Sequence, residues 1–86
     1  MHYVYVLKSE RDGNMYVGYT ANLRERITLH NAGKVKSTQA RRPFKLIYYE
    51  ACLGQKDALR REKYLKTAYG KRYIRNRLRG YPDEPG

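Results

Sequence analysis

Five side chains in this 86-residue sequence could hold a phosphate group and move a proton beside it. Two phenols, Tyr5 and Tyr16, stand in short aromatic and β-branched runs on either side of a turn. Arg26 and His30 follow four residues apart, the spacing that places two side chains on one face of a helix. A guanidinium suits phosphate oxygens, and a carboxylate such as Glu62 suits a hard divalent cation. These groups act together only if the fold gathers them.

The two tyrosines belong to a predicted β-hairpin. Its turn covers residues 9–14, where Asp12-Gly13 is a strong hairpin signal. Because strand side chains alternate, this turn puts Tyr5 on one face with Tyr16 and almost opposite Gly18. A strand glycine normally weakens the strand unless something must approach its backbone closely. Cross-strand packing of tyrosines beside an incidental glycine fits the same pattern.

Glu62 falls on the apolar side of a predicted helix. That apolar stripe consists of Ala58, Leu59, Leu65 and Tyr69. A carboxylate in this position is costly unless it pairs with a cation or binds a metal. Arg26 is available for such an ion pair, so the residues by themselves leave both interpretations open.

The elements that must position these groups follow from turn, capping and periodicity signals. Asn22, followed three residues later by Glu25, resembles a capping box and begins a helix that stops at Gly33. The full prediction is strands over 3–7, 15–19 and 44–52, a basic loop over 34–43, and helices over about 22–32, 55–69 and 71–79. Gly70 is expected to end the second helix.

The order β-β-α-β-α-α predicts an α/β (α+β) fold, a small three-stranded, mainly antiparallel sheet flanked by helices. The mostly apolar strand over 44–52 is expected to be the central one. Residues 1–80 are expected to form one domain, and residues 81–86 a flexible tail.

The charge balance indicates a polyanionic partner. Nineteen Lys and Arg against eight Asp and Glu give a formal net charge of +11. Cationic and hydroxyl residues gather in the loop after the first helix, where they could contact a phosphate backbone: Lys34, Lys36, Ser37, Thr38, Arg41 and Arg42. No apolar run is long enough to span a membrane, and no signal peptide is evident. The single Cys52 excludes an internal disulfide, and a cytoplasmic setting is expected.

Taken together, these residues resemble the GIY-YIG nuclease superfamily. Its two tripeptides correspond to Tyr3-Val4-Tyr5 and Tyr16-Val17-Gly18. The family's arginine falls on Arg26, its histidine on His30 and its metal-binding glutamate on Glu62. The resemblance covers roughly residues 3–70 and is closest to small stand-alone bacterial members, which are similar to the nuclease domain of the excinuclease of DNA excision repair.

Two positions depart from the family pattern. Tyr3 replaces the first motif glycine, a backbone position that leaves the chemistry intact. The asparagine that many members carry near the end of the domain has no clear match, although Asn76 could stand in for it. How the last helix meets the site is therefore left open.

The resemblance implies an endonuclease that hydrolyses nucleic-acid phosphodiester bonds with one Mg²⁺, or Mn²⁺, bound by Glu62. Arg26 would hold a phosphate oxygen, and His30 would hydrogen bond to the phosphate or a tyrosine. Tyr5 is preferred as the base and Tyr16 as a positioning donor, although the residues do not separate the two. Gly18 would leave space for the phosphate. We expect DNA rather than RNA as the partner, weak sequence specificity, no membrane association and a monomer.

Two other functions fit parts of the sequence. A DNA- or RNA-binding module without catalysis would use the same basic surface and stack bases on tyrosines. Such a module has no need of a carboxylate on a buried helix face, which argues against it. A scaffold that needs a partner protein would show an exposed apolar patch, and no such patch stands out in the sequence.

Overall fold

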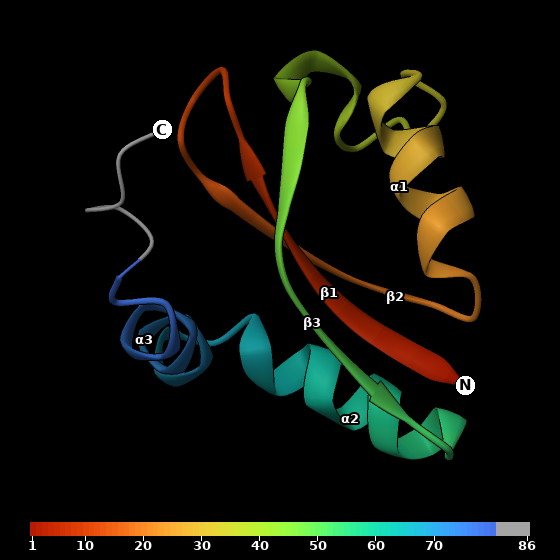
Figure 1. Cartoon of the computed structure of the whole chain (residues 1–86), viewed down its shortest axis with the longest axis vertical. Coiled ribbons are helices and arrows are strands. Elements are labelled where there is room, and N and C mark those ends of the chain that lie inside the picture. Colours follow the sequence, from red (N-terminus) through yellow and green to blue (C-terminus); the bar gives the residue numbers. More distant parts are fainter. Residues whose placement is uncertain (81–86) are drawn as a thin grey trace.

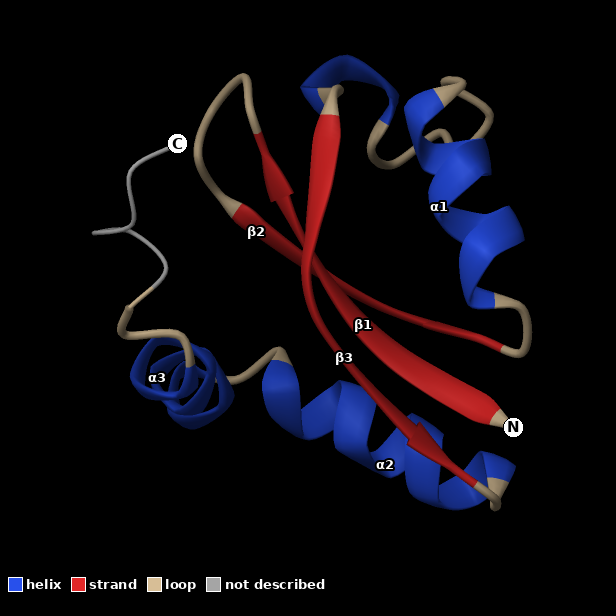
Figure 2. Cartoon of the chain, viewed as in Figure 1, coloured by secondary structure: helices blue, strands red, loops and turns tan. Residues whose placement is uncertain are grey.

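A three-stranded antiparallel sheet forms the middle layer of the molecule, with helices on both of its faces (Figures 1 and 2). The computed structural model describes residues 1–80, so the expected tail over 81–86 lies outside the described residues. The elements are β1 (His2–Ser9), β2 (Met15–Thr20), α1 (Leu23–Asn31), η1 (Gln39–Arg41), β3 (Phe44–Cys52), α2 (Gln55–Leu65) and α3 (Ala68–Arg77). This architecture confirms the predicted fold class.

The β1–β2 hairpin has the predicted register. Tyr5 lies opposite Gly18 and Leu7 opposite Tyr16, so both tyrosines share one face of the sheet. Gly13 takes the turn with a φ of 75°, a conformation that residues with a side chain rarely adopt. The turn signal and the alternation of side chains therefore located the two phenols correctly.

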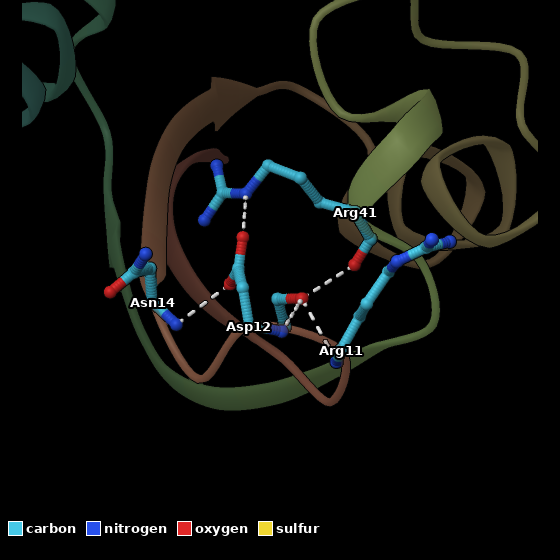
Figure 3. A network of polar contacts seen from close by, with 5 residues as sticks. Arg11, Asp12, Asn14 and Arg41 are labelled. Carbon is cyan, nitrogen blue, oxygen red and sulfur yellow. Dashed lines mark hydrogen bonds and ion pairs between the residues drawn. The ribbon is translucent and has the colours of Figure 1, made fainter.

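The hairpin loop is fastened to η1 by a network of polar contacts (Figure 3). The Ser9 hydroxyl accepts hydrogen bonds from the backbone N–H groups of Arg11 and Asp12 and donates to the Arg41 carbonyl over 2.6 Å. The Arg41 Nε donates to the Asp12 carboxylate over 2.9 Å. Two loops that are distant in the sequence are thus held together.

The prediction that the strand over 44–52 is central was wrong, because the strand order is β2-β1-β3. β1 is the strand that is covered on both faces, and its residues Val4 to Leu7 are each no more than 1% exposed. β3 is an edge strand, and its Tyr49 is 52% exposed. An apolar run signals burial, but in β3 only Phe44 is buried and the other residues are half-buried or exposed.

Two hydrophobic clusters lie on opposite faces of the sheet. Between the sheet and α1, the buried side chains are Tyr5, Leu7 and Phe44, with Leu23 and Ile27 of the helix packed against them. On the other face, α2 and α3 cover the sheet, as Figure 1 shows. The buried residues there are Val4, Val6, Val17, Ala58, Leu65 and Ile74. The alternation along β1 therefore separates the tyrosine face from the valine face.

Helix α1 begins and ends as predicted. The Asn22 side chain accepts a hydrogen bond from the Glu25 backbone N–H over 3.2 Å, and its amide donates to the Glu25 carboxylate. This is a variant of the capping box that the sequence indicated, because Glu25 accepts from the Asn22 side chain while the Asn22 backbone N–H donates to the Thr20 hydroxyl. Gly33 follows the helix with a φ of 77°.

The predicted single helix over 55–69 is in fact divided. Helix α2 ends at Leu65, and Thr67 caps the start of α3 by accepting a hydrogen bond from the Gly70 N–H over 3.1 Å. Gly70 is therefore an interior residue of α3 and not a helix stop. A Cβ at this position would collide with the backbone of Tyr64 and Leu65, so the glycine permits the sharp turn between the helices.

Arg61 fixes α2 against its neighbours. Its Nε donates to the Glu50 carboxylate of β3 over 2.7 Å, and this hydrogen bond raises the pKa of the guanidinium. Its guanidinium carbon lies 5.3 Å from the Tyr64 ring centre and 4.7 Å from that of Tyr73 in α3. The Arg61 guanidinium thus links its own helix α2 to β3 and α3, next to Glu62.

Replacing Gly70 with alanine tests the close approach of α2 and α3. Alanine normally stabilises a helix interior by about 0.5–1 kcal/mol relative to glycine. Here the added methyl group meets backbone, so we expect Gly70→Ala to lower the free energy of unfolding by about 1–3 kcal/mol in urea titrations. Lys71→Ala, at the exposed next position, serves as the control and should change stability little. A stabilised Gly70→Ala protein would contradict the packing.

Candidate active site

The Tyr5 ring lies over the backbone of Gly18. A Cβ at position 18 would collide with the Tyr5 Cζ and hydroxyl oxygen, so glycine is required for the ring to occupy this place. Tyr5 is only 1% exposed. The expectation that Gly18 leaves space for a phosphate is therefore corrected, since the space is filled by the Tyr5 phenol itself.

A chain of hydrogen bonds runs from Tyr5 into the loop after α1. The Tyr5 hydroxyl lies 2.8 Å from His30 Nε2, and His30 Nδ1 lies 2.8 Å from the Thr38 hydroxyl. The Thr38 hydroxyl donates to the Val35 carbonyl. Its single hydrogen is then committed, so Nδ1 carries the imidazole proton and Nε2 accepts from Tyr5. His30 and Thr38 are wholly buried.

The charges around this chain keep it neutral. Burial raises the pKa of Tyr5, while a side-chain hydrogen bond and the positive charge of Arg26 oppose the rise. Burial lowers the pKa of His30 from 6.5 to about 4, and the Arg26 charge acts in the same direction. At neutral pH Tyr5 is therefore a phenol that donates and His30 an uncharged imidazole that accepts.

Tyr16 and Arg26 lie on the same side of the sheet as Tyr5 and His30, and we call these four residues the tyrosine cluster. The Tyr16 ring meets the His30 ring edge-on, with centroids 5.1 Å apart, and lies 6.4 Å from the Tyr5 ring. Unlike Tyr5, Tyr16 is only half-buried. Arg26, on the half-buried side of α1, acts on both Tyr5 and His30. The cluster offers one accessible phenol beside one guanidinium.

Glu62 approaches the cluster from α2. Its negative charge contributes to the raised pKa of Tyr5, so the carboxylate acts on the phenol from another element. The Glu62 side chain is 20% exposed and pairs with the Lys66 ammonium at 3.1 Å. The ion pair considered from the sequence thus exists, but its cation is Lys66 rather than Arg26.

Helix α2 is less apolar around Glu62 than predicted. Ala58 and Leu65 are fully buried, whereas Leu59 is 42% exposed and Tyr69, which belongs to α3, is 72% exposed. Glu62 therefore lies at the margin of the buried face. Its carboxylate can thus reach solvent.

Comparison with protein-family models matches residues 1–78 to the GIY-YIG catalytic domain. This chain belongs to the GIY-YIG family. The GIY-YIG domain defines a nuclease superfamily, and the match covers every residue of the cluster.

Relatives extend the GIY-YIG assignment. A UPF0213 protein of Staphylococcus haemolyticus is 48% identical over 67 residues, which cover 77% of this chain and 80% of the relative. One of Bacillus licheniformis is 45% identical over 82 residues, covering 91% of this chain and 84% of the relative. The solution NMR structure of a UPF0213 protein from Bacillus halodurans is 34% identical, with a TM-score of 0.59, and covers 94% of this chain and 88% of that one. The chain is thus a small GIY-YIG protein of this bacterial type.

The donor set fits a single hard cation at the GIY-YIG glutamate. Among residues 1–80, no three His, Cys, Asp or Glu side chains gather as a metal site. Mg²⁺ is commonly held by one or two carboxylates, with waters and substrate phosphates as the other ligands. Glu62 can serve in this way, because its ion-pair partner is the half-exposed Lys66 ammonium, which a metal ion could replace.

The basic loop of this GIY-YIG domain divides into exposed and committed residues. Lys34, Lys36 and Ser37 are exposed. Thr38 is buried against His30, so its expected phosphate contact is corrected to a role in holding the imidazole. Arg41 pairs with Asp12, whereas Arg42 is exposed, with its guanidinium near Gly33.

Three further contacts were not predicted from the sequence. The ion pair between Lys66 and Glu62 could have been predicted from the sequence, because Glu and Lys four residues apart pair on a helix. Nothing in the sequence beyond the two residue types indicated the contact between Thr38 and His30. The Asn31 amide accepts from the Phe44 N–H over 2.7 Å and donates to the Phe44 carbonyl over 3.1 Å, pinning the end of α1 to β3.

In the part of the chain that the structure describes, no helix is long and apolar enough to cross a membrane. Asn76, the possible substitute for the family's asparagine, is exposed on α3. Its position does not bring a further buried amide to the GIY-YIG cluster.

The buried His30 predicts a pH dependence of stability. The unfolded imidazole takes up a proton near pH 6.5, whereas the folded one resists protonation down to about 4. Unfolding therefore binds a proton in this window, and stability falls as the pH drops from 6.5 towards 4. We expect a loss of about 2 kcal/mol at about pH 5 relative to about pH 8.

Urea unfolding of the wild type and His30→Gln at both pH values measures this effect. The comparison removes the contribution of the carboxylates, which both proteins share. The variant should be less stable at neutral pH but should lose less stability on acidification. Parallel losses in the two proteins would show that His30 is not the group responsible.

Proposed function

We propose that this chain is a metal-dependent endonuclease that hydrolyses phosphodiester bonds in nucleic acid, with DNA as its substrate and weak sequence specificity. The observation that carries the proposal is the gathering of the Tyr5, Tyr16 and His30 rings around the Tyr5 hydroxyl, with an acid and a base of other elements close enough to influence it. The guanidinium of Arg26, the phenol of Tyr16 and the carboxylate of Glu62 all act on this hydroxyl, from three different elements. Binding alone requires no carboxylate at this point.

Arg26 would bind the scissile phosphate. A planar guanidinium can offer two parallel hydrogen bonds to phosphate oxygens and offset the charge that develops in the transition state. Its half-buried position beside Tyr5 and His30 strengthens this interaction relative to an exposed arginine. Glu62 would hold Mg²⁺ or Mn²⁺, which when bound stabilises charge on the phosphate and on the leaving oxygen.

The burial of Tyr5 favours Tyr16 as the base, which reverses the preference drawn from the sequence. Tyr5 is covered and donates its proton to His30, so it is suited to positioning. Tyr16, half-buried beside it, can face a water molecule. Acting as the base, Tyr16 would take the proton of the attacking water as the new P–O bond forms, and the leaving oxygen would acquire a proton from solvent.

Arg26 supplies positive charge at the cluster, where its guanidinium acts on both Tyr5 and His30. His30 would not compete for the water proton, because its pKa of about 4 makes it a weak base. His30 would instead hold the Tyr5 ring in position, and the Tyr5 ring would in turn hold the neighbouring Tyr16 ring.

The exposed cations of the loop after α1 support a nucleic-acid backbone as the ligand. Lys34, Lys36, Ser37 and Arg42 are exposed and available for phosphate contacts, while Arg41 is held by its ion pair with Asp12. Contacts of this kind give salt-sensitive binding without sequence readout.

Tyrosine-to-phenylalanine variants separate the two phenols. We expect Tyr16→Phe to lower kcat by about 10²–10⁴-fold, the contribution typical of a general base, with little change in binding. Tyr5→Phe keeps the ring over Gly18 and should lower kcat less, by about tenfold or less, while reducing stability because a buried imidazole nitrogen loses its partner. The reverse ranking of the two kcat values would return the base role to Tyr5.

The decisive test of the nuclease is cleavage of labelled single-stranded, duplex and branched DNA, and of RNA, with Mg²⁺, Mn²⁺ or EDTA. Glu62→Gln should lower the cleavage rate about 100-fold or more and leave binding in EDTA unchanged. Lys66→Ala is the matched control, because it removes the same ion pair but keeps the carboxylate, and it should retain cleavage.

Each outcome has a distinct meaning. Binding by all three proteins with no cleavage of any substrate would reject the nuclease and leave a nucleic-acid binding module, in which the Glu62–Lys66 pair is simply structural. Cleavage that survives Glu62→Gln would reject Glu62 as the metal ligand.

A further inference from the structure

A cavity of about 880 Å³ lies between the hairpin loop, η1 and α3, away from the tyrosine cluster. Five cationic side chains line it: Lys8, Arg41, Lys71, Arg75 and Arg79. Its apolar lining consists of Met15, Ile47, Ile74 and Leu78. Within residues 1–80, no Asp or Glu side chain lines the cavity. We call it the α3 cavity.

The α3 cavity opens on the opposite face of the hairpin from the phenols. Met15 and Tyr16 are consecutive residues of β2, so their side chains point to opposite faces of the sheet. Met15 contributes to the cavity, and Tyr16 belongs to the cluster with His30. Because β2 is an edge strand, its free edge borders both faces of the hairpin.

A bulge in β3 adds to the apolar part of the cavity. The pairing of β1 with β3 shifts between Val6, which faces Tyr48, and Leu7, which faces Leu46. Ile47 is the extra residue, and both Ile47 and Tyr48 pack on the face covered by α2 and α3. An apolar side chain is thereby added to a site whose remaining surroundings are strongly basic.

Both the charge and the apolar surface point to unpaired nucleotides. The cations of α3, Lys71, Arg75 and Arg79, would bind successive phosphates, while Arg41 stays paired with Asp12. The apolar residues would contact the flat faces of bases. In a duplex those faces are stacked inside and cannot reach such a surface without the cost of unstacking. The volume lies within the range of about 300–1,000 Å³ that is usual for ligand sites.

We propose that the α3 cavity binds unpaired nucleotides of the strand that is cut at the tyrosine cluster, across the free edge of β2. This inference rests on the proposed nuclease function and names its substrate class. The preferred substrate is a nucleic acid with a single-stranded segment next to the scissile bond, rather than a uniform duplex.

Two double charge reversals on α3 test the cavity. Lys71→Glu with Arg75→Glu changes two lining residues one helical turn apart. Arg72→Glu with Arg77→Glu makes the same change of charge at exposed positions of the same helix that do not line the cavity. Circular dichroism and thermal unfolding of both proteins verify that they fold.

Binding is measured by fluorescence anisotropy in EDTA, with a short labelled oligothymidylate and a labelled duplex of equal length. Both variants should bind the duplex more weakly to a similar extent, because general electrostatic attraction falls equally. The cavity variant should lose about tenfold more affinity for the single strand than the control variant does. Thymidine monophosphate, used as a competitor, should displace the single strand poorly, since it engages only one phosphate.

Equal losses of single-strand affinity in the two variants would overturn the proposal, and so would full displacement by the mononucleotide, which would indicate a free-nucleotide site. Because the assay contains no metal and requires no cleavage, its result is independent of whether the protein cuts nucleic acid. A catalytically inactive chain could still show the binding difference, and an active one could lack it.

Discussion

The contact between the Tyr5 ring and the Gly18 backbone sets the geometry of this domain. With any side chain at position 18, the ring would have to leave the sheet surface, and its hydroxyl would no longer meet His30. From His30 the same line of contacts continues to Thr38 in the following loop. One buried phenol therefore joins β1, β2, α1 and the basic loop into a single unit.

This constraint also explains why buried polar groups are tolerated so close to a small core. Tyr5, His30 and Thr38 are each at most 1% exposed, and each has a hydrogen-bond partner in the line. A satisfied network of this kind fixes one arrangement of its members, whereas removal of any member leaves a buried group unpaired. The neutral state of the network follows from burial and from Arg26, and it leaves Tyr16 as the phenol exposed to water.

Local signals in the sequence were sufficient for most of the fold. The Asp12-Gly13 turn set the hairpin register, and the Asn22 capping box set the start of α1. The errors concern interactions between distant segments. That β1 rather than β3 is central depends on which strands pair, and the break at Thr67 depends on the approach of α3 to the Leu65 backbone.

For the site, too, local signals selected the residues, whereas the exposure of each side chain depended on distant contacts. Residue types and spacing were enough to select Tyr5, Tyr16, Arg26, His30 and Glu62, which act on one another in the structure. They could not tell which phenol is covered, because exposure depends on the ring's position over Gly18. They also could not show that Thr38 faces inward, since a hydroxyl in a basic loop fits a phosphate contact equally well.

The two hydrogen bonds between Asn31 and Phe44 have a consequence for association between molecules. β3 is an edge strand, and such strands can pair with another chain through their unused backbone groups. The Asn31 amide supplies one donor and one acceptor to the Phe44 backbone, as a neighbouring strand would. At the start of β3 a side chain thus takes the place of a neighbouring strand, and it opposes growth of the sheet into an aggregate at that corner.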